Sequence, residues 1–196
     1  MSYPLFEAED DASTPLTPEE RAALIPTYIS LRTELNEAEQ IGIVDADRWA
    51  FSRKRDVLRE DVLLQLHKRM FRDVWKWAGE FRRSERNIGI DHRHIGPELL
   101  TLIGDVRYWT QNQTFGPDEI AVRFHHRLVF IHPFPNGNGR WSRLAADLLA
   151  VQLGQKRFSW GSGNLIAIEE LRRRYVTALQ AADGNLIELL LTFARS

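Results

Sequence analysis

Apolar residues recur at three- and four-residue spacing along most of this chain, which is the period of an amphipathic α-helix. Within residues 57–77, for example, they fall at Leu63, Leu66, Met70 and Val74. Residues 117–131 repeat the pattern before the chain reaches a proline. No run with the two-residue period of a strand is long enough to build a sheet. The pattern therefore predicts an all-α fold.

Proline, glycine and capping residues set the expected helix boundaries. Thr17 is placed to cap a helix that starts at Pro18, and Gly42 is expected to close another. The expected helices span residues 17–25, 27–40, 45–53, 57–77, 97–112, 117–131, 139–153, 167–182 and 186–195. Residues 81–94 lack helical periodicity and are expected to form an exposed loop or a short β-hairpin-like flap. We divide the chain into a flexible leader (1–16), N-terminal helices (17–56) and a main domain (57–196).

Composition narrows the class of protein. The 196 residues are 43% hydrophobic and 27% charged, with a net charge of −1, as expected of one globular domain. A charge so near zero argues against direct nucleic-acid binding or attraction to an anionic membrane. The absence of cysteine excludes disulfides and thiolate chemistry and favours a cytoplasmic location. The acidic N-terminus does not resemble a signal peptide, and the apolar runs are too short to span a bilayer.

The segment between the two amphipathic helices expected at residues 117–131 and 139–153 carries the candidate chemistry. Gly137 and Gly139 flank Asn138 where the second of these helices is expected to begin. Backbone amides at a helix start, together with the helix dipole, form an anion site, and glycines let a ligand approach closely. Arg140 and Arg143 lie three residues apart in the first turn, where cations are unfavourable unless an anion binds. The pattern therefore predicts a polyphosphate site.

His132 lies at the other end of this loop. Imidazole titrates near neutral pH, so His132 is a candidate general base. Phe134 is expected to pack inward and anchor the loop. Simpler readings are a buried histidine satisfied in the core, an ion pair of Arg143 with Asp147, and a solvated Arg140. The spacing is not that of a P-loop or of a dinucleotide-binding turn.

The loop also resembles a known family. Residues 132–143, His-Pro-Phe-Pro-Asn-Gly-Asn-Gly-Arg-Trp-Ser-Arg, are similar to the Fic signature His-x-Phe-x-[Asp/Glu]-Gly-Asn-Gly-Arg-x-x-Arg. Residues 77–82, Trp-Ala-Gly-Glu-Phe-Arg, resemble the element before the Fic substrate flap. Residues 16–20 and 34–37 resemble the Fic subgroup named mobile mystery protein B. The resemblance extends from about residue 58 to residue 193.

The resemblance implies a Fic-type helical bundle with the active-site loop between two central helices. It implies transfer of AMP from ATP to a Ser, Thr or Tyr hydroxyl of a target protein, with His132 as the general base. The nucleotide would be held by Asn138, the amides of Gly137 and Gly139, Arg140, Arg143 and, on the adenine side, Tyr175. Gly139 stands where the phosphate-transferring Doc branch has lysine, which favours AMP transfer.

The family's flap and metal ligand have counterparts too. The flap that docks the target by strand-like pairing would comprise Arg83, Arg86, Asn87, Ile88, Gly89 and Ile90. Asn136 replaces the acid that binds Mg²⁺ in the family, and a neutral amide supplies no charge to that cation. Removal of AMP, transfer of another nucleotide group, or a weak nucleotide- or partner-binding module therefore stay open.

Many Fic proteins are inhibited by a glutamate of their own. Residues 33–37 fit the first five positions of the inhibitory motif, which implies that Glu37 pairs with Arg143. Glu34 belongs to a poorer frame, and an exposed helical glutamate is the simpler reading. The resemblance also implies a bacterial origin and a small helix-turn-helix companion, and it leaves a homodimer open. Zinc binding by residues 91–94 with His125 and His126 is disfavoured, since adjacent histidines point to different sides of a helix.

Overall fold

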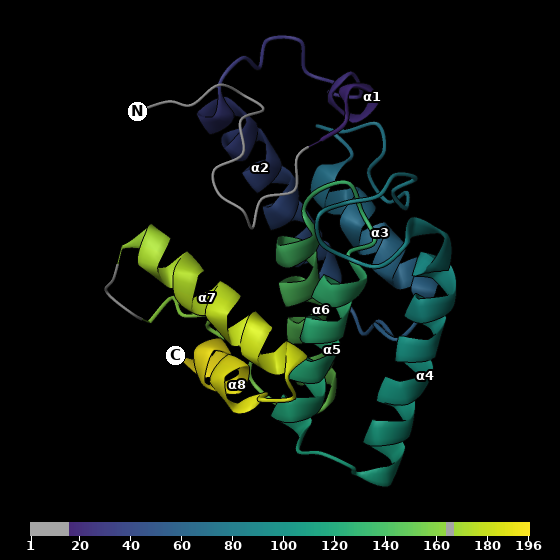
Figure 1. Ribbon diagram of the computed structural model, residues 1–196, viewed down its shortest axis with the longest axis vertical. Coiled ribbons are helices and arrows are strands. Elements are labelled where there is room, and N and C mark those ends of the chain that lie inside the picture. Colours follow the sequence, from purple (N-terminus) through teal and green to yellow (C-terminus); the bar gives the residue numbers. More distant parts are fainter. Residues whose placement is uncertain (1–15, 164–166) are drawn as a thin grey trace.

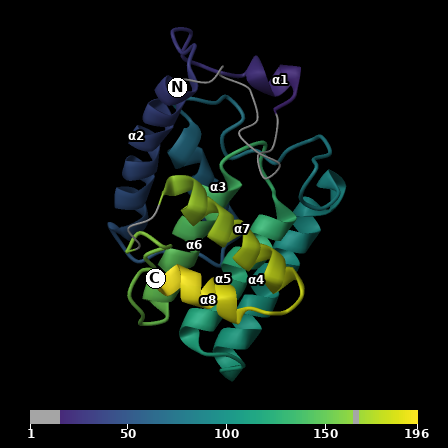
Figure 2. The same cartoon turned by 60° about the vertical axis from the view of Figure 1, so that its left-hand side comes forward.

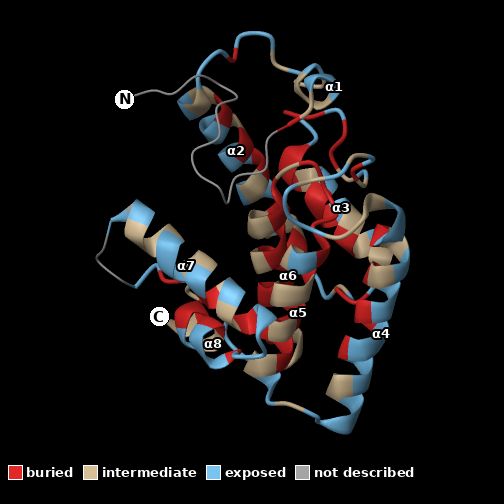
Figure 3. Cartoon of the chain, viewed as in Figure 1, coloured by how far each residue is buried: buried red, intermediate tan, exposed pale blue. Residues whose placement is uncertain are grey.

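Two central helices, α5 (Pro117–Ile131) and α6 (Asn138–Gln152), pack along each other in the computed structural model (Figure 1). The structure describes residues 16–163 and 167–196, and within these ranges it is helical and contains no strand. α6 buries residues on nearly every side, including Trp141 and Leu148, and Figure 3 shows this buried centre in red. The predicted all-α class is confirmed. The leader predicted at residues 1–16 lies outside the described residues except for Leu16.

The helix α2 (Arg32–Phe51) packs along α3 (Glu60–Phe71) and runs without a break through Gly42. A Cβ on Gly42 would lie 2.3 Å from the carbonyl oxygen of Met70. This glycine therefore permits close packing of the two helices, and the predicted end of a helix before Gly42 is wrong. The two helices expected at residues 27–40 and 45–53 are one.

The remaining long helices surround the central pair. After a 3-10 turn, η1 (His92–His94), α4 (Ile95–Asn112) runs along one side of α5. Figure 2 shows α7 (Ile168–Asp183) and α8 (Glu188–Arg195) crossing α5 and α6. The guanidinium of Arg195 holds α8 to the start of α5, with Nε 2.8 Å from a carboxylate oxygen of Asp118. None of the helices in the described ranges has the length and apolar content needed to cross a membrane.

The N-terminal turn, α1 (Pro18–Arg21), lies against the segment that follows α3. A capping box between Thr17 and Glu20 closes its start, as the Thr-Pro-Glu-Glu pattern predicts. Residues 23–25 then pair with residues 74–76 in an antiparallel bridge. This pairing brings Glu20 beside the loop that leads to the candidate site.

Candidate active site

The loop between α5 and α6 turns through two left-handed residues. His132, at the end of α5, has φ 52° and ψ 60°, and Pro133 prevents further helix. Gly137, the N-cap of α6, has φ 81°, and a Cβ there would lie 2.5 Å from the Phe71 ring. Side chains other than glycine are strained in this conformation. The loop thus places His132 at one end and the first amides of α6 at the other.

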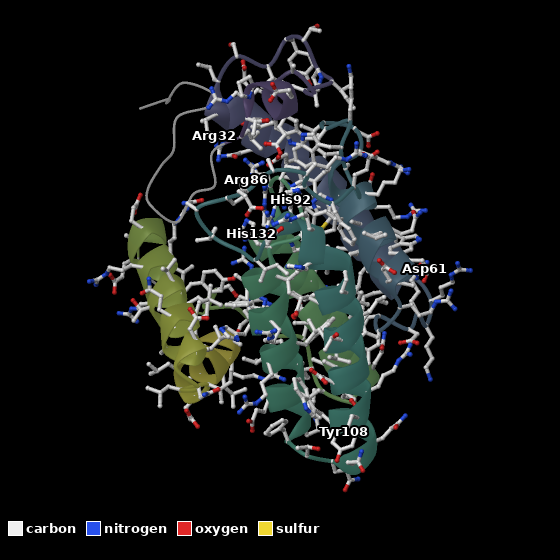
Figure 4. All side chains as sticks on the ribbon, turned by 45° about the vertical axis from the view of Figure 1, so that its right-hand side comes forward. Arg32, Asp61, Arg86, His92, Tyr108 and His132 are labelled. Carbon is white, nitrogen blue, oxygen red and sulfur yellow. The ribbon has the colours of Figure 1, made fainter. Side chains whose placement is uncertain are left out.

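His132 is only 7% exposed. Burial lowers its pKa to about 4, and the nearby charge of Arg82 adds to this effect. A hydrogen bond with the Val129 backbone acts in the opposite direction, and Arg86 lowers the pKa further. The imidazole is therefore neutral at pH 7 and able to accept a proton. Figure 4 labels His132 and Arg86 at the end of the bundle opposite Tyr108.

Asn138 closes the loop through its side chain. Its Oδ1 accepts the N–H of Phe134 at 2.9 Å, and its Nδ2 donates to the carbonyl of Phe134 at 2.8 Å. The Phe134 ring is fully buried, as predicted for an anchor. Asn138 thus fixes the backbone of the loop at the predicted anion site. The amides in the first turn of α6 lack partners within the helix and point outward, in the manner of a phosphate site.

Arg140 and Arg143 lie on one face of α6, as predicted, but they have different neighbours. Arg140 Nη1 lies 2.6 Å from Oε2 of Glu39, which projects from α2. The other carboxylate oxygen of Glu39 accepts the indole N–H of Trp75 at 2.7 Å. The Arg143 guanidinium lies 5.4 Å from the centre of the Tyr175 ring. A cavity of about 310 Å³ between α2 and α6 is lined by both arginines.

Glu37 is exposed, and the ion pairs seen among the described residues do not include its predicted pairing with Arg143. The buried residues of α2 include Leu35 and Glu39, one helical turn apart, so Glu37 lies between them on the exposed side. Glu34 accepts the N–H groups of Ser30 and Leu31 at 2.8 and 3.0 Å and caps its own helix. The glutamate that reaches the motif arginines is Glu39, and its partner is Arg140.

The Asn136 side chain is directed to the backbone. Its Oδ1 lies 2.5 Å from the amide nitrogen of Gly137, so the oxygen predicted as a metal ligand already accepts a hydrogen bond. One neutral oxygen engaged in this way does not fit a resident Mg²⁺, which prefers carboxylates, phosphates and water. The only other group of metal-ligand type among the described residues is Glu85, Asp91 and His92. There Glu85 lies 2.6 Å from Nδ1 of His92, and both carboxylate oxygens of Asp91 contact Arg93.

Residues 83–90, which we call the flap, contain no strand, so the predicted β-hairpin is not formed. Arg83, Asn87 and Ile88 are exposed, as a docking surface requires. The Arg86 side chain is only 4% exposed and pairs with Glu20 of α1. The flap is thus an irregular loop that is fixed at Arg86 and accessible on either side of it.

Three further residues belong to the site, and residue type alone did not identify them. His67 is fully buried between the N–H of Gly79 and the carbonyl of Asn136, each 3.0 Å from a ring nitrogen. His125 is also buried, and its Nε2 lies 3.0 Å from the hydroxyl of Tyr175. Burial lowers the pKa of both histidines to about 3. The third is Arg82. The helical period could have placed His67 and His125 inside, but not their partners.

The Tyr175 hydroxyl faces the start of α6. A Cβ on Gly139 would lie 3.8 Å from this oxygen, which is its one neighbour within 4 Å apart from adjacent residues and the backbone of α6. Burial raises the pKa of Tyr175 to about 12, so the hydroxyl is neutral and shares a hydrogen bond with the neutral His125. Tyr175 therefore lies beside the predicted phosphate site.

Comparison with known proteins shows that this chain belongs to the Fic/DOC family. The Fic/DOC family model matches residues 57–150. Protein adenylyltransferase Fic from Aedes aegypti is 32% identical over 145 residues, which are 71% of this chain and 28% of that protein. The protein of the same name from Drosophila melanogaster is 37% identical over 106 residues, 52% of this chain and 21% of its own length. The chain thus spans about a quarter of the length of these relatives.

Solved structures share the fold. Fic-1 from C. elegans superposes with a TM-score of 0.68 at 22% identity, over 90% of this chain and 52% of its own. BepC from Bartonella tribocorum, solved with bound AMPPNP, gives a TM-score of 0.67 at 17% identity, over 91% and 97%. A Bartonella quintana Fic domain with bound ADP gives 0.64 at 19% identity, over 86% of each chain.

Proposed function

We propose, from the premise that residues 57–150 form a Fic/DOC family domain, that this protein transfers AMP from ATP to a Ser, Thr or Tyr hydroxyl of a target protein. One observation carries the proposal: a buried, neutral histidine and the amide-rich start of α6 lie at the two ends of one short loop. The relatives named protein adenylyltransferase support the same activity.

The reaction needs only positioning, charge neutralisation and one proton acceptor. The target hydroxyl oxygen bonds to the α-phosphorus of ATP while the bond from that phosphorus to the bridging oxygen breaks. Pyrophosphate leaves with the electron pair, and His132 accepts the hydroxyl proton. The amide of Gly139 would hold the α-phosphate together with that of Gly137, once Gly137 exchanges its bond to Asn136 Oδ1 for the phosphate. Arg140 would lie on the β-phosphate and Arg143 on the γ-phosphate. Any Mg²⁺ would enter with the phosphates, since Asn136 Oδ1 is engaged with the backbone.

Tyr175 and the exposed part of the flap complete the proposed site. Tyr175 supports the Arg143 guanidinium with its ring and borders the nucleotide site with its hydroxyl. Arg83, Asn87 and Ile88 would meet the target peptide. Arg86, Gly89 and Ile90 would hold the flap against the loop. Membership of the mobile mystery protein B subgroup, a bacterial origin, a helix-turn-helix companion and a homodimer stay predictions from the sequence.

We assign self-inhibition to Glu39 in place of Glu37. The supporting contact is the ion pair at 2.6 Å with Arg140, whose guanidinium the β-phosphate would need. Glu39 is buried and also held by Trp75, so it competes as a preorganised partner. An ATP molecule bound productively would have to displace Glu39 from Arg140.

A second function has one observation in its favour. The loop supplies no acid for a metal because residue 136 is Asn, and one of its donors, the Gly137 amide, is occupied by Asn136 Oδ1. A nucleotide-binding module with little or no transfer activity would tolerate this arrangement. The test below separates the two.

The test is self-labelling with ATP carrying radioactive α-phosphate, followed by mass spectrometry for an added AMP. The parent is compared with His132→Ala and with a matched control, His126→Ala, whose ring pairs with Asp183 away from the loop. Transfer predicts label in the parent and in His126→Ala but not in His132→Ala. Equal label in all three would overturn the role of His132. ATP binding without label in both the parent and Glu39→Gln, which lacks the inhibiting charge, would establish the module.

A further inference from the structure

The Arg82 side chain is buried at the base of the flap, with 2% of the residue exposed. Its Nε donates to the carbonyl of His132 at 2.7 Å. Its Nη1 donates to the carbonyl of Ser84 at 2.8 Å, and its Nη2 donates to the carbonyl of Ile90. One planar group thus joins the candidate base to both ends of the flap.

The backbone of Arg82 adds a fourth link, since its N–H donates to the carbonyl of Pro133 at 2.9 Å. Arg82 therefore holds the two residues at the start of the active-site loop, His132 and Pro133. All three side-chain acceptors are main-chain carbonyls. Burying a guanidinium is costly, and three oriented carbonyls compensate only while the flap stays closed on the loop.

Gly89 shows how closely the flap fits. A Cβ at this position would lie 2.6 Å from the Cβ of His132 and 2.9 Å from Nη2 of Arg82. The φ of Gly89 is +98°, a conformation that other residues rarely adopt. The flap therefore rests directly on His132, and no side chain separates them.

The outer side of the flap is fixed independently. Glu20 accepts hydrogen bonds from Arg86 and, at 3.3 Å, from the Ser84 hydroxyl. The flap is thus held from α1 by Glu20 and from the loop by Arg82. The charged groups that face His132 across it are Arg82 and Arg86, the latter paired with Glu20.

We propose that Arg82 is a positioning residue that couples the flap to the base, so that a target peptide docked on residues 83–90 is held in register with the His132 ring. The proposal rests on the proposed function for its catalytic consequence, although the coupling itself is a property of the free protein. It accounts for a buried cation whose side chain donates to three carbonyls of the flap and the loop. The Arg82 charge has a second effect, because it contributes to the low pKa of His132.

Two substitutions separate the geometry from the charge. Arg82→Lys keeps the positive charge but cannot reach three carbonyls with a planar fork. Arg82→Gln removes the charge as well. The matched control is Arg72→Gln at the half-exposed end of α3, where an arginine pairs with its neighbour Asp73.

Three quantities are measured for each variant. They are the amide hydrogen exchange rates of residues 83–90, the His132 pKa from NMR titration of its ring, and the kcat and KM of self-labelling from its rate at different ATP concentrations. For Arg82→Lys we expect flap exchange about tenfold faster or more and a His132 pKa near that of the parent. Its kcat should fall by roughly 10- to 100-fold with little change in the KM for ATP. Arg82→Gln should in addition raise the His132 pKa. The control should match the parent.

Flap exchange in Arg82→Lys equal to that of the parent would overturn the coupling. An unchanged His132 pKa in a folded Arg82→Gln would overturn the electrostatic contribution. Should Arg82→Gln fail to fold, Arg82→Lys decides the coupling alone. Absence of label in both the parent and Glu39→Gln refutes the proposed function instead, and the exchange and NMR measurements still decide the role of Arg82.

Discussion

Glu39 of α2 and Arg140 of α6 form an ion pair at 2.6 Å although 101 residues separate them in the sequence. The carboxylate side chain is 3% exposed and the guanidinium side chain 31%. The pair therefore links a buried anion to a cation that solvent, or a phosphate, can reach. The Arg140 guanidinium is therefore placed to exchange Glu39 for a phosphate.

Glu39→Gln should increase self-labelling with AMP by roughly tenfold or more, since loss of the charge removes the competitor of the β-phosphate at about 1.4 kcal/mol per tenfold. Glutamine keeps an oxygen for the indole N–H of Trp75, so the packing of α2 is preserved. The matched control is Glu37→Gln, which removes the same charge from the exposed side of the same helix. Equal labelling by the two variants would contradict inhibition through Glu39.

His67 of α3 holds the loop between α5 and α6 in place. Its ring stacks on Phe134 with centroids 3.6 Å apart and bonds Gly79 and Asn136 through its two nitrogens. His67→Phe keeps a stacked ring but leaves a buried N–H and a buried carbonyl without partners. We expect the free energy of unfolding to fall by about 2–4 kcal/mol, and self-labelling to fall with it.

The control for His67 is His94→Phe, which changes an exposed histidine after the flap. Urea titration of the three proteins measures the difference. A His67→Phe variant as stable as the parent would mean that the two hydrogen bonds contribute nothing net.

Gly137→Ala tests the conformation of the loop. The residue has φ 81°, and its Cβ would contact the Phe71 ring at 2.5 Å, so the variant should lose roughly 1–3 kcal/mol of stability. Gly104→Ala is the matched control, because Gly104 lies inside α4 and its added Cβ would meet nothing within 4 Å beyond adjacent residues and the backbone of its own helix. It should gain about 0.5–1 kcal/mol. Thermal unfolding of both variants checks the opposite signs.

How far the sequence predicts this site depends on the kind of information each feature needs. Pro117, Pro133 and the helical period define α5 and the start of the loop, because these signals are local. A linear motif predicts Glu37 as the inhibitory residue. Glu39 takes that place because of the phase of α2, that is, which side of this helix faces α3. The phase follows from packing across the bundle and is not visible in the motif.

Gly42 and Arg82 illustrate the same limit. A glycine after a polar run resembles a helix end. Gly42 instead lies inside α2, where the lack of a side chain lets the Met70 carbonyl approach closely. The partners of Arg82 are main-chain carbonyls, which leave no signature in the residue types. Features that depend on long-range contact with backbone groups therefore emerge only with the structure.

Three buried histidines should make the protein labile to mild acid. Burial lowers the pKa of His67 and His125 to about 3 and that of His132 to about 4. The unfolded chain binds protons at these groups near pH 6.5, while the folded chain does not. Stability is therefore greatest above pH 6.5 and falls as the pH drops toward the folded-state values. Each group adds a slope of at most about 1.4 kcal/mol per pH unit.

Urea titrations between about pH 7.5 and about pH 4.5 measure this slope. Asp147 acts in the opposite sense, because burial raises its pKa, but it is present in all three proteins and does not change the differences between their slopes. His67→Phe removes one of the three groups, so its curve should be flatter than that of the parent by up to one proton. His94→Phe, which changes an exposed ring, should run parallel to the parent. Parallel curves for all three proteins would show that His67 is protonated in the folded state and that its buried hydrogen bonds differ from those described.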